Sequence, residues 1–206
     1  MWNKHHKFKS LYSVYLRTLH KCKNSIRWGS AEKHSHIRYC YTSILFTQLL
    51  NGARVSEAAE AIYRFYITGE RNQAVVVRKT RKRIIYRLVR VPEPIEAKYL
   101  GHILQCYKNI ENLKTVKTSN ISSWAIKYFR REEGIELNTH TNRYAFITYC
   151  IGELNINPIK VQKITKHANL NQITKYTDDE VAQRLVIKIQ DDVMDLDGEK
   201  NVQETE

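Results

Sequence analysis

Apolar residues recur every three or four positions through most of the chain, the spacing that places them on one face of a helix. This pattern predicts helices over residues 8–23, 36–51, 56–63, 94–108, 120–133, 140–154, 159–167 and 178–190, with a further helical turn near Tyr176. Several ends carry residues that stop or start helices: Gly52 and Gly134 follow two of them, and Asn157-Pro158 precedes another. The chain is therefore predicted to be mainly helical.

The period changes between residues 63 and 90. Runs rich in β-branched and aromatic residues occupy 63–67, 74–78 and 83–90, and turn residues separate them. We interpret these runs as a small three-stranded antiparallel sheet, which gives a mainly α-helical α+β fold. The second turn of this sheet is strongly basic, because residues 68–90 hold eight Lys and Arg and one acid.

Composition indicates an ordinary folded chain in a reducing compartment. Of the 206 residues, 42% are hydrophobic and 27% charged, which is enough to build a core. The sequence has no run of about 18 apolar residues, so no membrane span is predicted. The first residues lack the apolar stretch of a secretory signal. The four cysteines are scattered, which disfavours both a disulfide framework and a zinc site. We expect a cytoplasmic protein, associated with the nucleoid or, if a virus encodes it, with the host cytoplasm.

Charge is unevenly distributed along the chain. The formal net charge is +13, yet residues 191–206 sum to −6, so the preceding part carries +19. A positive excess of this size favours a polyanionic partner such as nucleic acid. The alternative, a basic protein with no such partner, remains open at this point. We expect a basic arm and first helix over 1–35, a main domain over 36–190 and an acidic, disordered tail over 191–206.

Several polar residues recur in a particular order and are candidates for chemistry. Along the chain they are Arg54, Glu57, Lys79, His140, Arg143, His167 and Tyr176. Singly, each has an ordinary structural interpretation: an arginine paired with a nearby glutamate, a turn lysine, surface or capping histidines, and a packed tyrosine. The ordered set favours function more strongly than any one member.

Two boxes in this set resemble those of the tyrosine recombinases, the phage-integrase-like family. Residues 52–57, Gly-Ala-Arg-Val-Ser-Glu, resemble the G-x-R-x-S-E box, and residues 140–146, His-Thr-Asn-Arg-Tyr-Ala-Phe, resemble the H-x-L-R-H-x-F box. A turn lysine, a downstream histidine and a tyrosine nine residues after it complete the pattern, which runs from Asn51 to about Thr177. The chain departs from the family at 165–167, where Thr-Lys-His replaces L-G-H, and at Tyr144, where histidine is common. The resemblance implies the tyrosine recombinase catalytic fold.

The resemblance also implies roles for the charged residues. Arg54 and Arg143 would clamp the non-bridging oxygens of a DNA phosphate, because a guanidinium makes paired, charge-assisted bonds to phosphate and stays protonated. Glu57 would support Arg54 and the fold.

The remaining roles concern bond breaking. Tyr176 would attack phosphorus and form a 3′-phosphotyrosine, which conserves the energy of the broken bond. Lys79 would protonate the leaving 5′ oxygen, and Lys82 is a competitor for that role. His140 would assist as acid or base, and His167 would donate to a non-bridging oxygen. No cofactor or metal is implied, and no acidic cluster predicts a Mg²⁺ site.

We expect duplex DNA carrying specific recombination sites as the partner. The predicted phosphate contacts are Arg78, Arg81, Lys82, Arg83, Lys160, Lys163 and Lys166. The resemblance further implies a monomer or weak dimer in free solution and a tetramer on DNA, with segment 178–190 exchanged between protomers. The predicted function is site-specific integration, excision or resolution, in the service of a viral or plasmid element. Two alternatives stay open: strand relaxation of the type IB topoisomerase kind, and a non-catalytic DNA-binding relative.

Overall fold

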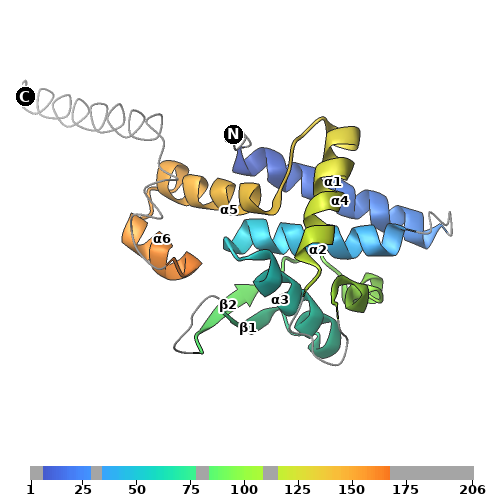
Figure 1. The fold of residues 1–206 in the computed structure, drawn as a ribbon, viewed down its shortest axis with the longest axis horizontal. Helices are drawn as coiled ribbons and strands as arrows, with labels where there is room; N and C mark the ends of the chain where they lie inside the picture. Colours follow the sequence, from blue (N-terminus) through green and yellow to red (C-terminus); the bar gives the residue numbers. More distant parts are fainter. Residues whose placement is uncertain (1–6, 29–33, 78–83, 109–115, 168–206) are drawn as a thin grey trace, which may run out of the picture. The chain divides into compact units, whose positions relative to one another are not determined.

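The computed structural model describes residues 7–28, 34–77, 84–108 and 116–167. It forms two compact units, Met1–Phe146 and Ile147–Glu206. In the first unit, α1 (Phe8–Arg27) and α2 (Ser35–Asn51) lie side by side and antiparallel, as Figure 1 shows. Helix α2 is buried on almost every side, the pattern of a central helix. The core of this unit is therefore built around α2.

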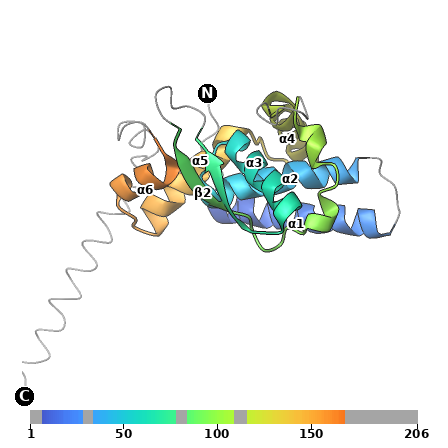
Figure 2. The same ribbon diagram turned by 90° about the horizontal axis from the view of Figure 1, so that it is seen from below.

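Helix α3 (Val55–Thr68) follows α2 after a sharp turn and supports the small sheet. Strands β1 (Asn72–Val76) and β2 (Tyr86–Arg90) pair antiparallel with Ala74 opposite Leu88. Figure 2 shows this sheet lying against α3. The inward positions are Gln73 and Val75 on β1 and Arg87 and Val89 on β2. An arginine therefore occupies a core-facing position of the sheet.

The predicted third strand is wrong: the described residues form a two-stranded sheet. Residues 63–67 belong to α3, which continues to Thr68 and ends at Gly69 in the left-handed conformation. Phe65 packs into the core from this last turn, whereas Ile67 faces outward. Tertiary packing of the helix outweighs the weak β preference of this aromatic and β-branched run.

The predicted helix over 94–108 is also wrong. The chain forms two short 3₁₀ turns there, η1 (Ala97–Tyr99) and η2 (Ile103–Cys106). Arg71 donates to the carbonyls of Pro92 and Ile95 at 2.7 and 3.2 Å, which holds the start of this segment in a turn.

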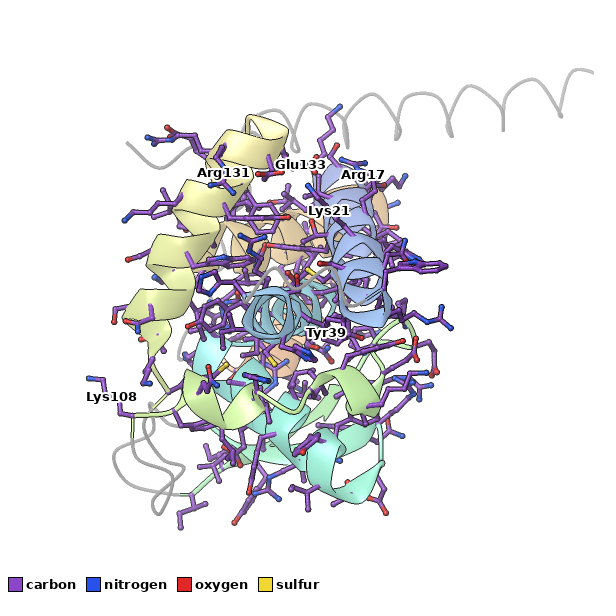
Figure 3. All side chains as sticks on the ribbon, turned by 90° about the vertical axis from the view of Figure 1, so that its right-hand side faces the viewer. Arg17, Lys21, Tyr39, Lys108, Arg131 and Glu133 are labelled. Carbon is purple, nitrogen blue, oxygen red and sulfur yellow. The ribbon has the colours of Figure 1, made fainter. Side chains whose placement is uncertain are left out.

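Helix α4 (Thr118–Glu133) packs on α1 and α2 through aromatic side chains. The Tyr15 ring meets Phe129 edge-on at 5.5 Å and Phe46 at 6.1 Å. At the surface, Arg17 pairs with Glu133 and Lys21 with Glu132, so charges on α1 face those on α4 (Figure 3). Such exposed pairs contribute at most about 1 kcal/mol each, so the apolar contacts dominate.

Helix α5 (Thr139–Thr148) closes the first unit and leads into the second, where residues Tyr149–Glu153 (η3) wind as a π-helix. Helix α6 (Pro158–Thr165) begins as predicted, with the Asn157 side chain accepting from the Ile159 amide. Across the described ranges, no helix is both long and apolar enough to span a bilayer.

Candidate active site

The first predicted box forms the turn between α2 and α3. Gly52 ends α2 with φ at +55°, a left-handed conformation that favours glycine. A Cβ added at this position would overlap the Phe146 ring, so there is no room for a side chain. Arg54 then caps the start of α3 from an extended conformation. The box therefore places Arg54 at the first turn of a helix, directly after a close contact with α5.

Glu57 is fully buried and joins two arginines. One carboxylate oxygen accepts from the Arg54 guanidinium at 2.8 Å. The other accepts from the Arg54 backbone amide at 3.0 Å and from the Arg87 guanidinium at 3.3 Å. A carboxylate in the first turn also suits the positive end of a helix. Burial lowers the pKa of Arg87, and the Glu57 charge opposes that shift. Glu57 therefore contacts Arg54 and Arg87 at once, and the two arginines share its charge.

The second predicted box opens α5. The Asn138 side chain accepts from the amides of His140 and Thr141 at 2.8 and 3.0 Å and so caps the helix. His140 is exposed, whereas Arg143 is buried, with 6% of its surface accessible. The Arg143 guanidinium donates to the Gly52 carbonyl at 2.8 Å. The arginine of the second box is thus held against the first box, two residues from Arg54.

A buried polar network fixes the orientation of α5. Asn142 lies where the resembled box has leucine, and it is completely buried. Its side-chain oxygen accepts from the Tyr15 hydroxyl at 2.7 Å, and its amide donates to the Gln48 side chain at 3.1 Å and the Leu45 carbonyl at 3.3 Å. Gln48 in turn donates to the Thr139 carbonyl at 2.7 Å. Helices α1 and α2 therefore set the rotation of the helix that carries His140 and Arg143.

Comparisons with known proteins bear on this arrangement. No family model matches the chain. It is similar to an uncharacterised protein of Methanocaldococcus jannaschii, with 27% identity over 92% of this chain and 89% of that protein. It is also similar to two viral proteins predicted to be integrases. The one from Acidianus two-tailed virus is 30% identical over 73% of this chain and 56% of its own length, and the one from Sputnik virophage is 26% identical over 77% of each.

Among solved structures, the XerA recombinase superposes with a TM-score of 0.53 at 18% identity, over 85% of this chain and 62% of XerA. The XerH site-specific recombinase bound to palindromic difH in its post-cleavage complex gives 0.55 at 17% identity, over 88% and 51%. The chain has the tyrosine recombinase fold. It spans about half to three fifths of the length of these two solved recombinases. The predicted resemblance and its fold are confirmed, apart from the third strand.

The second unit carries His167, the downstream histidine of the predicted pattern. His167 directly follows the end of α6, and its Nδ1 lies 2.6 Å from the Thr165 hydroxyl. Lys160 and Lys163 are exposed on α6. Lys166, the third predicted phosphate contact of this region, lies just past the helix in the left-handed conformation. All three lysines face solvent.

Other predicted site residues lie outside the described residues. These are Arg78, Lys79, Arg81, Lys82, Arg83 and Tyr176, together with the segment 178–190. Their roles, and the choice between Lys79 and Lys82, stay predictions. Within the part that is described, no three His, Cys, Asp or Glu side chains gather as metal ligands. The thiols offer no ready nucleophile, because burial raises the pKa of Cys106 to about 12 and of Cys150 to about 11.

Sequence reasoning missed two groups that support this site. Arg87 holds Glu57 from β2, and the residues Tyr15, Gln48 and Asn142 fix α5. The signal for Arg87 was its place in an alternating strand, where Arg87 and Val89 share a face. An arginine at such a position needs a buried partner.

Proposed function

We propose that this chain is a site-specific DNA recombinase that cuts and rejoins duplex DNA through a covalent 3′-phosphotyrosine on Tyr176. The observation that supports this most is the bond from Arg143 to the Gly52 carbonyl. It brings the arginines of both boxes to one short segment of backbone, the arrangement that a phosphate clamp requires. Two guanidiniums so placed would offset the charge that develops on the non-bridging oxygens during attack.

The proposed reaction conserves bonds at each step. The Tyr176 oxygen forms a bond to phosphorus while the bond from phosphorus to the 5′ oxygen breaks. The tyrosine proton passes to a base, for which His140 is the candidate, and Lys79 or Lys82 protonates the departing 5′ oxygen. A 5′ hydroxyl from the partner strand reverses these transfers and regenerates the tyrosine. His167 donates to a non-bridging oxygen. Neither a metal nor ATP is needed for this exchange, because the phosphotyrosine stores the bond energy.

Duplex DNA bearing recombination sites is the proposed substrate, with a protein tetramer assembling on two sites. The proposed phosphate contacts are the basic residues of segment 78–83 and the exposed Lys160, Lys163 and Lys166. Each phosphate neutralised releases condensed counterions, so affinity should fall steeply as salt rises. The integrase names of the two viral relatives and the site-specific recombinase XerH support this substrate.

Covalent trapping on DNA of randomised sequence tests the proposal and finds the target site in the same experiment. The protein is incubated in EDTA with a library of nicked duplexes whose central segment is randomised, and adducts are isolated under denaturing conditions and sequenced. We expect adducts enriched for one sequence, formed by the wild type and by Tyr86→Phe but absent with Tyr176→Phe. Tyr86 is a suitable control because it is 58% exposed on the outer face of β2.

Variants of the clamp complete the experiment. Arg54→Ala and Arg143→Ala should each lower the rate of adduct formation by about 10²–10³-fold, the usual effect of losing one preorganised donor. Arg90→Ala, on the exposed end of β2, should leave it unchanged. Adducts spread over random sequences would instead indicate relaxation of the topoisomerase kind. Salt-sensitive binding with no adduct on any sequence would indicate a non-catalytic relative and would contradict the proposal.

A further inference from the structure

Arg87 is buried behind the first box, and neither predicted box includes it. Its side chain is 4% exposed, on the face of β2 that packs against α3. One guanidinium nitrogen donates to Glu57 at 3.3 Å and another donates to the Asn51 carbonyl at 2.7 Å. The planar guanidinium of Arg87 therefore hydrogen-bonds to the end of α2 and to the first turn of α3 at once. Lysine cannot reproduce this geometry.

Arg87 binds the segment 51–54, which also contains Arg54 and contacts Arg143, the two arginines of the proposed phosphate clamp. The Asn51 side chain pairs with the backbone of Arg90 through two bonds of 2.9 and 3.0 Å, which docks the segment on β2. The next carbonyl, that of Gly52, accepts from Arg143, and Arg54 follows two residues later. Contacts from β2 thus hold Asn51 at one end of segment 51–54, and Arg54 of the clamp lies at the other end.

The charges around Glu57 add a second effect. Arg54 and Arg87 share this single carboxylate, so the group of three carries a net positive charge. Without Arg87, Arg54 would be the one cation left against Glu57 among the residues that the structure describes, and this pair would be neutral. Arg54 would then be drawn more strongly to Glu57 and would offer less charge to an anion in front of it. Because Glu57 is fully buried, little solvent screening weakens this competition.

We propose that Arg87 is a positioning residue for the phosphate clamp: it shares Glu57 with Arg54 and anchors Asn51, so that Arg54 keeps its charge available for the scissile phosphate. This inference rests on the proposed function, because it assigns Arg87 a part in that reaction. Arg87 itself does not touch the phosphate; it acts through Arg54 and through the segment 51–54.

The test compares cleavage of two linkages by variants of the full chain. Single-turnover adduct formation is measured at saturating DNA, on the trapped sequence with an ordinary phosphodiester and with a neutral methylphosphonate at the scissile position. The variants are Arg87→Met, Arg87→Lys and the double variant Glu57→Gln with Arg87→Met, with Arg90→Met as the exposed control on the same strand. Thermal unfolding and DNA affinity are measured beside each rate.

We expect Arg87→Met to slow cleavage of the phosphodiester by about 10²–10³-fold while DNA affinity changes little. On the methylphosphonate, which lacks the charge that Arg54 offsets, Arg87→Met and the wild type should react at nearly the same rate. The double variant removes the charge of Glu57 together with that of Arg87, so it should recover part of the phosphodiester rate. Arg87→Lys keeps the charge but cannot span both partners, and its rate should lie between those of wild type and Arg87→Met.

Different failures have different meanings. If Arg87→Met loses activity equally on both linkages, or if the double variant is no faster than Arg87→Met, then Arg87 only supports the fold and the inference is wrong. If Arg87→Met does not fold, Arg87→Lys and the double variant decide between the same two outcomes. A wild-type chain that forms no adduct with any phosphodiester overturns the proposed function, and this inference with it.

Discussion

The close approach of Gly52 to the Phe146 ring predicts that a side chain at position 52 destabilises the fold. Gly52 has φ at +55°, and a Cβ placed there would lie 2.7 Å from Cε1 of Phe146 and closer still to Cδ1. In Gly52→Ala the left-handed conformation costs about 1–2 kcal/mol. The forced displacement of the ring adds about 1–3 kcal/mol, the usual cost of overpacking. We therefore expect Gly52→Ala to lower the free energy of unfolding by about 2–5 kcal/mol.

Matched glycines separate the two costs. Gly134 and Gly69 also have positive φ, at +65° and +75°, yet a Cβ added at either position would meet no atom within 4 Å. Alanine at these two sites should cost only about 1–2 kcal/mol. Urea denaturation followed by tryptophan fluorescence gives each value. Adding Phe146→Leu to Gly52→Ala should restore part of the lost unfolding free energy. The effects of Phe146→Leu and Gly134→Ala on that free energy should simply add.

The reasoning fails if Gly52→Ala costs no more than Gly134→Ala, because the ring would then leave room for a side chain. It also fails if Phe146→Leu shows no coupling to Gly52→Ala. Since the Gly52 carbonyl accepts from Arg143, the same substitution should slow adduct formation, and Gly134→Ala should not.

Three further predictions concern other parts of the chain. Tyr15→Phe leaves the Asn142 side chain without its donor and should cost about 1–3 kcal/mol of unfolding free energy in urea, and adding Asn142→Leu should recover part of it. Hydrogen bonds from Lys23 and Lys98 lower the pKa of Glu96 to about 2, so its contribution to stability is present above about pH 4.5 and is lost as pH falls toward 2. Lys23→Met should reduce that loss, measured as the difference in Tm from wild type across this range, and an unchanged difference would contradict it. The Cys106 thiol, with its pKa raised to about 12, should resist a thiol reagent at pH 8 until urea unfolds the chain, and rapid labelling of the native protein would contradict its burial.

Local chemistry explains which parts of the fold were predictable. Gly52, Gly134 and Asn157 end or begin helices where the sequence indicated, because the left-handed cap and the side-chain cap depend on the residues themselves. The residues of both predicted boxes likewise lie at helix ends, at the start of α3 and at the start of α5.

Features that depend on long-range packing were not predictable in this way. The run 63–67 has strand-like residues but continues α3, and 94–108 has helical spacing but forms turns that Arg71 holds. On β2 the usual burial of apolar residues and exposure of charged residues is inverted, because Leu88 is 66% exposed whereas Arg87 is buried. Its partners Glu57 and Asn51 lie 30 and 36 residues away, so no local pattern indicates them.

The proposed reaction requires a covalent bond between DNA and Tyr176, and peptide mapping of the trapped adduct identifies the residue that carries the DNA. Trypsin is expected to release residues 176–184, Tyr-Thr-Asp-Asp-Glu-Val-Ala-Gln-Arg, a peptide with a single tyrosine. After nuclease digestion, mass spectrometry should find that peptide carrying a nucleotide joined through its 3′ phosphate to Tyr176. A nucleotide on any other residue, or an adduct that still forms with Tyr176→Phe, would contradict the account.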